Sequence, residues 1–253
     1  MALALPSTLA PRLLPLRLPK VCLALSADTV EDMLATAESM ARDDPFLEFR
    51  LDYLKQPVAA LTKIHRFLET HQYVTAIATC RRVDSGGKFK GSLASQLEVL
   101  TKAHAAGCLI VDLELQSALK AKPEAIARLR SRAGLILSFH DFRATRNLEE
   151  TLEKMLKIPA DFYKVVTTAT TLFDNVAMMK LLQTQSDKHA LIGLCMGEHR
   201  VPECIEFVKI NPSRPHHLGH HHKLISAFMK LINPCPQDPM DLCGFLFSYC
   251  PKM

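Results

Sequence analysis

The segment Asp-Phe-Tyr-Lys-Val-Val-Thr-Thr-Ala, residues 161–169, is an apolar, largely β-branched run with a lysine near its centre. Such a run predicts a β-strand that helices bury on both faces, as in a parallel sheet. Burial there disfavours the ammonium form of Lys164, which predicts a neutral amine able to attack a carbonyl. Alternatively, the stem of this lysine packs along the strand and its ammonium group reaches solvent or pairs with a carboxylate.

Outward from this segment, short apolar runs alternate with helical patterns from Val21 onward, which is typical of βα units around a parallel sheet. Strands are expected at residues 21–25, 46–51, 74–79, 109–113, 134–139, around Lys164 and at 190–195. Helices are expected from a cap at 26–28 to about 41, and at 58–68, 92–105, 118–129, 147–156 and 172–182.

Seven such units predict a (β/α)8 TIM barrel, which commonly forms one domain of about 250 residues. The competing fold is an open doubly wound sheet, but the G-x-G-x-x-G turn after the first strand is missing. We therefore expect barrel units one to seven over residues 21–198, and an atypical segment, possibly a partial eighth unit, over 199–253. The proline-interrupted residues 1–20 are expected to form an extended or disordered lead-in.

The composition excludes some classes of partner. The 253 residues are 48% hydrophobic and 23% charged, and the net charge of +5 is not gathered in a basic block, so nucleic acid is not expected as a partner. No apolar run reaches about 18 residues, so no membrane span is expected. The first four of the eight cysteines lie in strand-like apolar runs, which predicts buried thiols of a cytoplasmic protein.

Polar residues follow the expected strands at their carboxyl ends, where the catalytic groups of a barrel gather. The strand ends read Glu48-Phe49-Arg50-Leu51-Asp52, Thr79-Cys80-Arg81-Arg82, Asp112-Leu113-Glu114 and Ser138-Phe139-His140-Asp141. Charged side chains that alternate on one strand face are costly inside a barrel unless they are paired or functional. Five successive strands with such residues, including the strand of Lys164, therefore predict an active site.

These residue types suit a ketone substrate that carries a carboxylate. Lys164 is expected to form an imine with the ketone, and His140 to act as general acid and base. The forked donors of Arg50 and Arg81 are expected to hold a carboxylate or hydroxyl groups. For His140 the alternative is a core histidine bonded to a backbone carbonyl.

The chain resembles the type I 3-dehydroquinate dehydratases of the shikimate pathway. The resemblance spans residues 21–198 and rests on motifs in the family's order and spacing: Glu48 to Asp52, Thr79-Cys80-Arg81, Asp112-Leu113-Glu114, Ser138 to Phe142, Lys164 and Met196-Gly197-Glu198.

The resemblance implies a barrel, usually a homodimer, without metal or cofactor. It implies that Lys164 forms the imine, that His140 transfers the protons, and that Glu48, Arg50 and Arg81 bind 3-dehydroquinate as it loses water to give 3-dehydroshikimate. Family members often place a glutamate in the loop after the third strand to orient the histidine, and Ser85 stands at that position here.

After Glu198 the family pattern ends. The expected Ser-Arg pair and Pro-Gly-Gln are missing, and six of the eleven histidines, four of the eight cysteines and seven of the fifteen prolines follow. Three interpretations remain: a metal site formed by the histidines at 216–222 with nearby cysteines, a divergent eighth unit with a strand at 204–210 and a helix at 223–232, or a shifted reading frame after codon 198.

Two alternative functions remain at this point. Another lysine-imine lyase, such as a class I aldolase, would share Lys164 but need not share His140, Glu48 and Arg50. A catalytically impaired remnant or a binding protein on the same barrel is favoured by the missing arginine after Glu198.

Overall fold

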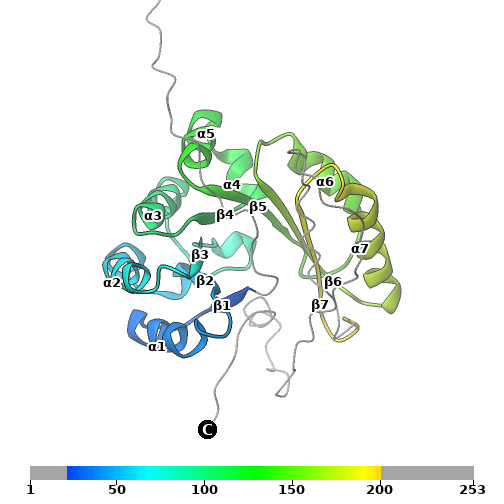
Figure 1. The fold of residues 1–253 in the computed structure, drawn as a ribbon. Helices are drawn as coiled ribbons and strands as arrows, with labels where there is room; N and C mark the ends of the chain where they lie inside the picture. The colour runs from blue at the N-terminus through cyan, green and yellow to red at the C-terminus, as the bar shows by residue number, and fades with distance from the viewer. Residues whose placement is uncertain (1–21, 201–253) are drawn as a thin grey trace, which may run out of the picture.

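The computed structural model describes residues 22–200, in which seven parallel strands form one curved sheet (Figure 1). The strands lie side by side in chain order from β1 to β7. Their bounds are β1 Leu23–Leu25, β2 Phe46–Arg50, β3 Thr75–Thr79, β4 Ile110–Glu114, β5 Gly134–His140, β6 Phe162–Thr168 and β7 Leu191–Met196. The order and the parallel pairing confirm the predicted (β/α) barrel topology for these units.

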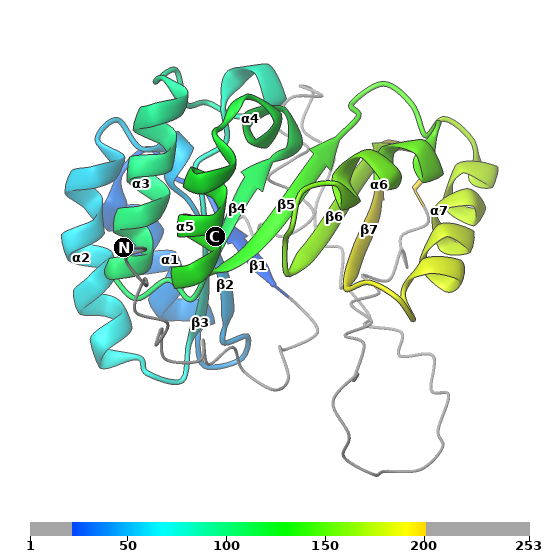
Figure 2. The ribbon, with the colours of Figure 1, turned by 90° about the horizontal axis from the view of Figure 1, so that it is seen from above.

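Helices connect the strands and lie outside the curved sheet (Figure 2). Their bounds are α1 Val30–Met40, α2 Pro57–Thr70, α3 Leu93–Ala105, α4 Leu115–Lys120, α5 Pro123–Arg132, α6 Leu148–Leu156 and α7 Leu172–Gln185, with short 3-10 helices η1 at Leu51–Tyr53 and η2 at Val83–Ser85. Parallel strands need such crossovers because the end of one strand and the start of the next lie at opposite ends of the sheet.

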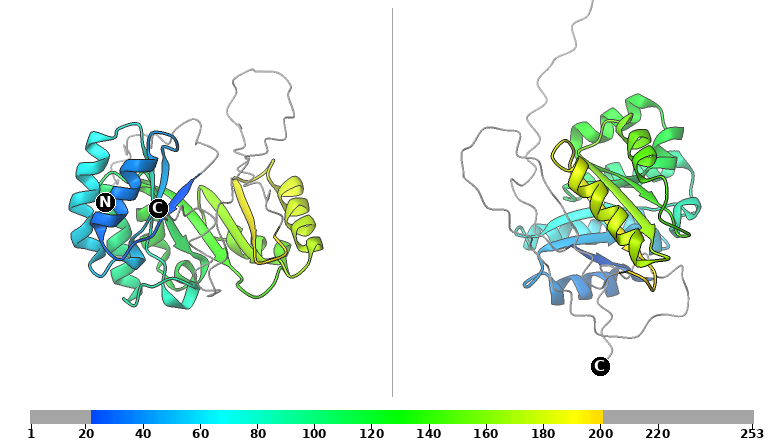
Figure 3. Two further views of the ribbon diagram at one scale, coloured as in Figure 1. Left: turned by 90° about the horizontal axis from the view of Figure 1, so that it is seen from below. Right: turned by 90° about the vertical axis from the view of Figure 1, so that its right-hand side faces the viewer.

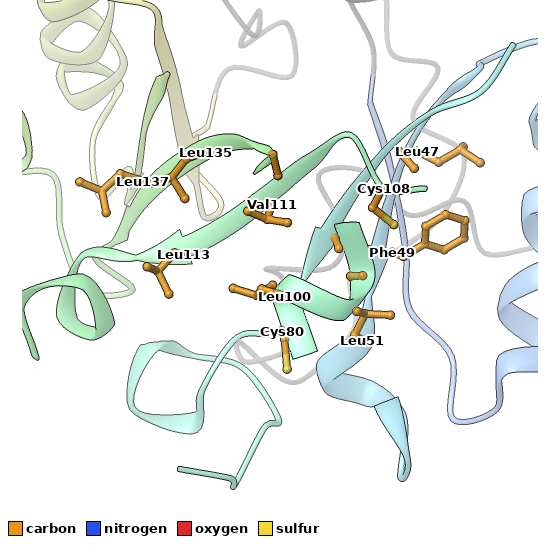
Figure 4. Close-up of a cluster of buried hydrophobic side chains, with 14 of the residues drawn as sticks. Leu47, Phe49, Leu51, Cys80, Leu100, Cys108, Val111, Leu113, Leu135 and Leu137 are labelled. Atoms are coloured by element: carbon orange, nitrogen blue, oxygen red, sulfur yellow. The ribbon is translucent and has the colours of Figure 1, made fainter. Parts of the chain in front are cut away.

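The outer face of the sheet forms the larger hydrophobic core. Side chains such as Leu47, Phe49, Val111 and Leu135 are buried there against the helices (Figure 4). Burying a Leu or Phe side chain contributes about 1.5–3 kcal/mol, so this layer is a principal source of stability. The near-continuous apolar strands follow from burial on both faces.

The inner face changes character along each strand. An apolar layer packs inside the barrel and contains Phe46, Ile77, Ile110, Ile136, Phe162 and Ile192. Two residues further along β2 to β6, the same face carries Glu48, Thr79, Asp112, Ser138 and Lys164. The period of two therefore brings polar side chains together at the carboxyl ends of the strands, above an apolar floor.

Two local expectations were wrong. Helix α1 is capped by Thr29, whose side chain accepts a hydrogen bond from the Asp32 backbone, instead of by residues 26–28. The single helix expected at 118–129 is split into α4 and α5. Pro123 occupies the first position of α5 and disfavours helical backbone at the preceding Lys122, which is extended.

The edge strands β1 and β7 each pair with one strand within residues 22–200, and α7 packs along β7 (Figure 3). The predictions for the lead-in at 1–20 and, apart from His199 and Arg200, for the segment at 199–253 lie outside the described residues. Among the helices described, none has the length and apolar character needed to cross a membrane.

Candidate active site

Lys164 lies on the inner face of β6 and is 7% exposed. Its Nζ is 3.6 Å from Glu48 Oε2 on β2 and 3.9 Å from Asp112 Oδ2 on β4. The structure therefore shows the pairing with carboxylates that the sequence left as an alternative, at a buried position inside the barrel. Both carboxylates lie within ion-pair distance of the nitrogen, so Lys164 has acidic partners on β2 and β4.

Glu48 is buried and receives a hydrogen bond of 2.5 Å from Thr79 Oγ1 on the neighbouring strand. Burial alone would raise its pKa, but the charges of Lys164, Arg81 and Arg50 and the bond from Thr79 outweigh it and lower the pKa of Glu48 to about 2. Glu48 is therefore a carboxylate throughout the physiological pH range.

Asp112 joins both sides of the site, a role that the sequence analysis did not assign. It accepts a hydrogen bond of 2.6 Å from Ser138 Oγ and one of 3.3 Å from Arg81 Nη2, in addition to its proximity to Lys164. The sequence signal that could have identified this residue is its position in the motif Asp112-Leu113-Glu114 at a strand end.

The guanidinium of Arg50 is buried and held in a forked pair. Its Nε and Nη2 donate to the two oxygens of Asp52 at 3.0 and 2.9 Å, and its Cζ lies 4.9 Å from the ring centroid of Tyr53. Although burial acts in the opposite direction, the charge and hydrogen bonds of Asp52 and the charge of Glu48 raise the pKa of Arg50 above its usual value. Arg50 is therefore a fixed, permanent cation.

His140 ends β5 on the same face as Ser138, which pairs in register with Lys164. Burial, followed by the charges of Arg81, Lys164 and Arg50, lowers the pKa of His140 well below its ordinary value. The imidazole is thus neutral at physiological pH and can accept a proton.

The ring of His140 stacks against Phe142, with centroids 5.9 Å apart. Its Nδ1 is shielded from solvent and has no hydrogen-bond partner among the described residues, Ser85 included. The alternative of a core histidine bonded to a backbone carbonyl through Nδ1 is therefore not observed. The loop after β3 packs against the ring of Phe142, because a Cβ on Gly86, whose φ is +79°, would lie 2.2 Å from Cζ of Phe142.

The residues predicted from the sequence lie together in this site. They are linked by charge, hydrogen bonds or strand register, and they are Lys164, His140, Glu48, Arg50 and Arg81. A buried amine, a neutral imidazole and fixed cations can together form an imine, move a proton and hold an anionic substrate. Within residues 22–200, no three His, Cys, Asp or Glu side chains are grouped to hold a metal ion, and the histidines at 216–222 lie outside this range.

Comparison with known proteins finds a family model and curated relatives that match most of the chain. The family model described as type I 3-dehydroquinase matches residues 21–201. A 3-dehydroquinate dehydratase of Dehalococcoides mccartyi is 33% identical over 188 residues, which cover 72% of this chain and 78% of that protein. A Coxiella burnetii protein of the same name is 30% identical over 186 residues, covering 72% and 76%.

Solved structures share the fold. The 3-dehydroquinate dehydratase of Geobacillus kaustophilus superposes with a TM-score of 0.65 at 19% identity, over 72% of this chain and 75% of that one. The type I enzyme of Clostridium difficile, solved with covalently modified comenic acid, gives a TM-score of 0.63 at 18% identity, over 71% and 76%.

Proposed function

The chain belongs to the type I 3-dehydroquinase family, and on that premise we propose that it eliminates water from 3-dehydroquinate through an imine on Lys164. The observation that carries the proposal is the buried Lys164, at the convergence of five strand ends, with a neutral His140 on the adjoining strand. The reaction class is that of a hydro-lyase.

Imine formation comes first. The amine of Lys164 attacks the ketone carbon, and loss of the carbonyl oxygen as water leaves a protonated imine. Because Lys164 is paired with Glu48 and Asp112 before substrate binds, the ammonium gives up a proton as the ketone enters, and two of its protons end on the carbonyl oxygen, which leaves as water. The positive imine then takes over the electrostatic partners that the ammonium had.

Elimination follows on the same face of the barrel. The neutral imidazole of His140 removes a proton from the carbon next to the imine, and the electron pair moves into the imine to give an enamine. The enamine expels the hydroxyl group, which takes the proton from the imidazolium and leaves as water. Hydrolysis of the conjugated imine releases 3-dehydroshikimate and Lys164.

Substrate binding is assigned to Arg50, Arg81 and Glu48. Arg50 uses two of its five donors on Asp52, an arrangement that fixes the plane of its fork for recognition of a carboxylate or hydroxyl groups. Arg81 donates from Nη2 to Asp112 at 3.3 Å, which places its guanidinium beside the same carboxylate that faces Lys164. Glu48 can accept from a substrate hydroxyl because it stays ionised.

We also propose that the chain acts as a cytoplasmic homodimer. The exposed apolar side chains of Leu172, Phe173, Val176 and Met179 lie along α7, and such a surface supports contact with a second copy. Sedimentation should give twice the chain mass, and a monomer at all concentrations would contradict the dimer.

The cytoplasmic location is supported by the thiols, which are buried and form no disulfides among the described residues. Burial raises the pKa of Cys108, for example, to about 12.

The test of the proposed function is conversion of 3-dehydroquinate by the full chain, followed by the ultraviolet absorbance of the conjugated product. His140→Ala should lower kcat by about 10²–10⁴-fold, because it removes the general acid and base. His65→Ala is the matched control, since that ring is 47% exposed on α2, and it should leave kcat unchanged. A folded wild-type chain that gives no product would instead favour the non-catalytic binding protein.

A further inference from the structure

A second buried polar network lies behind the site and holds the backbone on both sides of Arg81. Gln96 on α3 donates its Nε2 to the carbonyl oxygen of Cys80 at 2.9 Å. Glu114, the last residue of β4, accepts the backbone N–H of Arg82 at 2.6 Å through Oε1, and its Oε2 accepts from Gln96 Nε2. The two peptide groups that flank Arg81 are therefore attached to α3 and β4.

The network is fixed in one orientation. Ser117 Oγ donates to Gln96 Oε1 at 2.9 Å, so the amide nitrogen of Gln96 must face Cys80 and Glu114. The side chains of Gln96, Ser117 and Glu114 are no more than 2% exposed. Each broken bond would leave a buried polar group unsatisfied, which costs about 1–3 kcal/mol, so the network is rigid.

Arg81 lies at a point where the sheet itself no longer fixes the chain. β3 ends at Thr79, and its register with β4 ends at the pair Thr79 and Asp112. Beyond it, strand β4 holds both ends of Arg81: Asp112 accepts from the guanidinium, and Glu114, two residues further on the same strand, accepts from the next peptide N–H.

We propose that Glu114 and Gln96 are positioning residues that place Arg81 for substrate binding. The proposal rests on the function proposed above, in which Arg81 binds 3-dehydroquinate. A glutamate fits position 114 because two N–H donors face its two oxygens, and each oxygen accepts one of them. A glutamine there would direct an NH2 group at one of these donors and release either Arg82 or Gln96.

The test is a double-mutant cycle in the full chain with 3-dehydroquinate as substrate. Glu114→Gln should raise KM about tenfold and leave kcat within about twofold, because ground state and transition state lose the same contact. In the Arg81→Met background, Glu114→Gln should change KM by less than about twofold, since the residue that it positions is gone. Glu98→Gln, at an exposed site on the same helix α3, is the control and should change neither.

Reversal of the donor and acceptor provides a rescue. In the double variant Glu114→Gln with Gln96→Glu, the new amide can donate to position 96 while its oxygen accepts from Arg82, but the carbonyl oxygen of Cys80 loses its donor from position 96. The rescue is therefore partial: KM should fall below that of the single variant Glu114→Gln without reaching the wild-type value. An equal effect of Glu114→Gln in both Arg81 backgrounds, or a loss of kcat at constant KM, would show that the network supports the fold alone and overturn the proposal.

Amide hydrogen exchange separates this proposal from the proposed function. If the folded wild type does not convert 3-dehydroquinate, the proposed function fails, while exchange at the Arg82 amide still reports the restraint. Glu114→Gln should speed this exchange at least tenfold and leave the amides of β6 unchanged. Unchanged exchange at Arg82, or equal acceleration throughout the sheet, would overturn the positioning role.

Discussion

Replacement of Glu48 by glutamine tests the electrostatics of the site in a stability measurement. The surrounding cations lower the pKa of Glu48 from 4.5 to about 2, so the folded chain binds this carboxylate's proton less readily than the unfolded chain does. The contribution of Glu48 to the free energy of unfolding is therefore fully present above about pH 4.5 and is lost as pH falls towards 2. At about 1.4 kcal/mol for each pKa unit, it amounts to about 3 kcal/mol.

The assay is urea unfolding of wild type and Glu48→Gln at pH 7 and pH 3. The variant should be the less stable at pH 7, because Lys164 loses one of its two carboxylate partners. The difference in free energy of unfolding between the two proteins should shrink by about 2 kcal/mol at pH 3, where the wild type has lost most of the Glu48 contribution. Glu153→Gln, at an exposed position on α6, is the control.

A difference between wild type and Glu48→Gln that stays constant from pH 7 to pH 3 would refute the reasoning. It would mean that the charges of Lys164, Arg81 and Arg50 do not act on Glu48 in the folded protein. A difference that grows at pH 3 would reverse the sign and exclude the ion pair as the cause.

Three further perturbations have defined outcomes. The pH below which kcat/KM falls should be lower than the ordinary pKa of a histidine, because the pKa of His140 is lowered. Arg81→Met should move this pH upward, since removal of a nearby cation raises the pKa of His140. A move to lower pH would contradict this assignment. Asp52→Asn should cost about 3–5 kcal/mol in urea unfolding, because Arg50 stays buried without its counter-ion, and a loss below 1 kcal/mol would count against it. Gly86→Ala should lower the free energy of unfolding by at least about 1 kcal/mol, because φ is +79° and its Cβ would meet an aromatic ring; unchanged stability would show that the loop can move away.

Much of the fold could be predicted from hydrophobic period and strand spacing. The six strands with expected bounds begin and end within two residues of them, and the strand expected around Lys164 is β6, because apolar runs buried on both faces are a strong local signal. The division between α4 and α5 was missed although Pro123 marks it, since the apolar pattern continues across the break. Helix α1 begins at Val30, one residue later than a cap at Asp28 would place it, because Thr29 provides the cap.

The site was predictable as a set of strand ends but not as a set of contacts. The period of two placed Glu48 and Arg50 on the inner face, whereas the approach of Asp112 to Lys164 depends on the curvature that brings β4 and β6 towards each other. The same limit applies to Gln96, whose role depends on how α3 packs on β4. Such contacts join residues far apart in sequence, and no local pattern specifies them.

The central claim is that Lys164 forms the imine with the substrate ketone. The direct measurement is borohydride reduction of the full chain in the presence of 3-dehydroquinate, followed by peptide mass mapping, with Lys164→Arg as the control that keeps a cation beside Glu48 and Asp112. The account predicts a stable adduct on Lys164 in the wild type and none in the variant. An adduct on another lysine, or turnover by the wild type with no adduct, would contradict it.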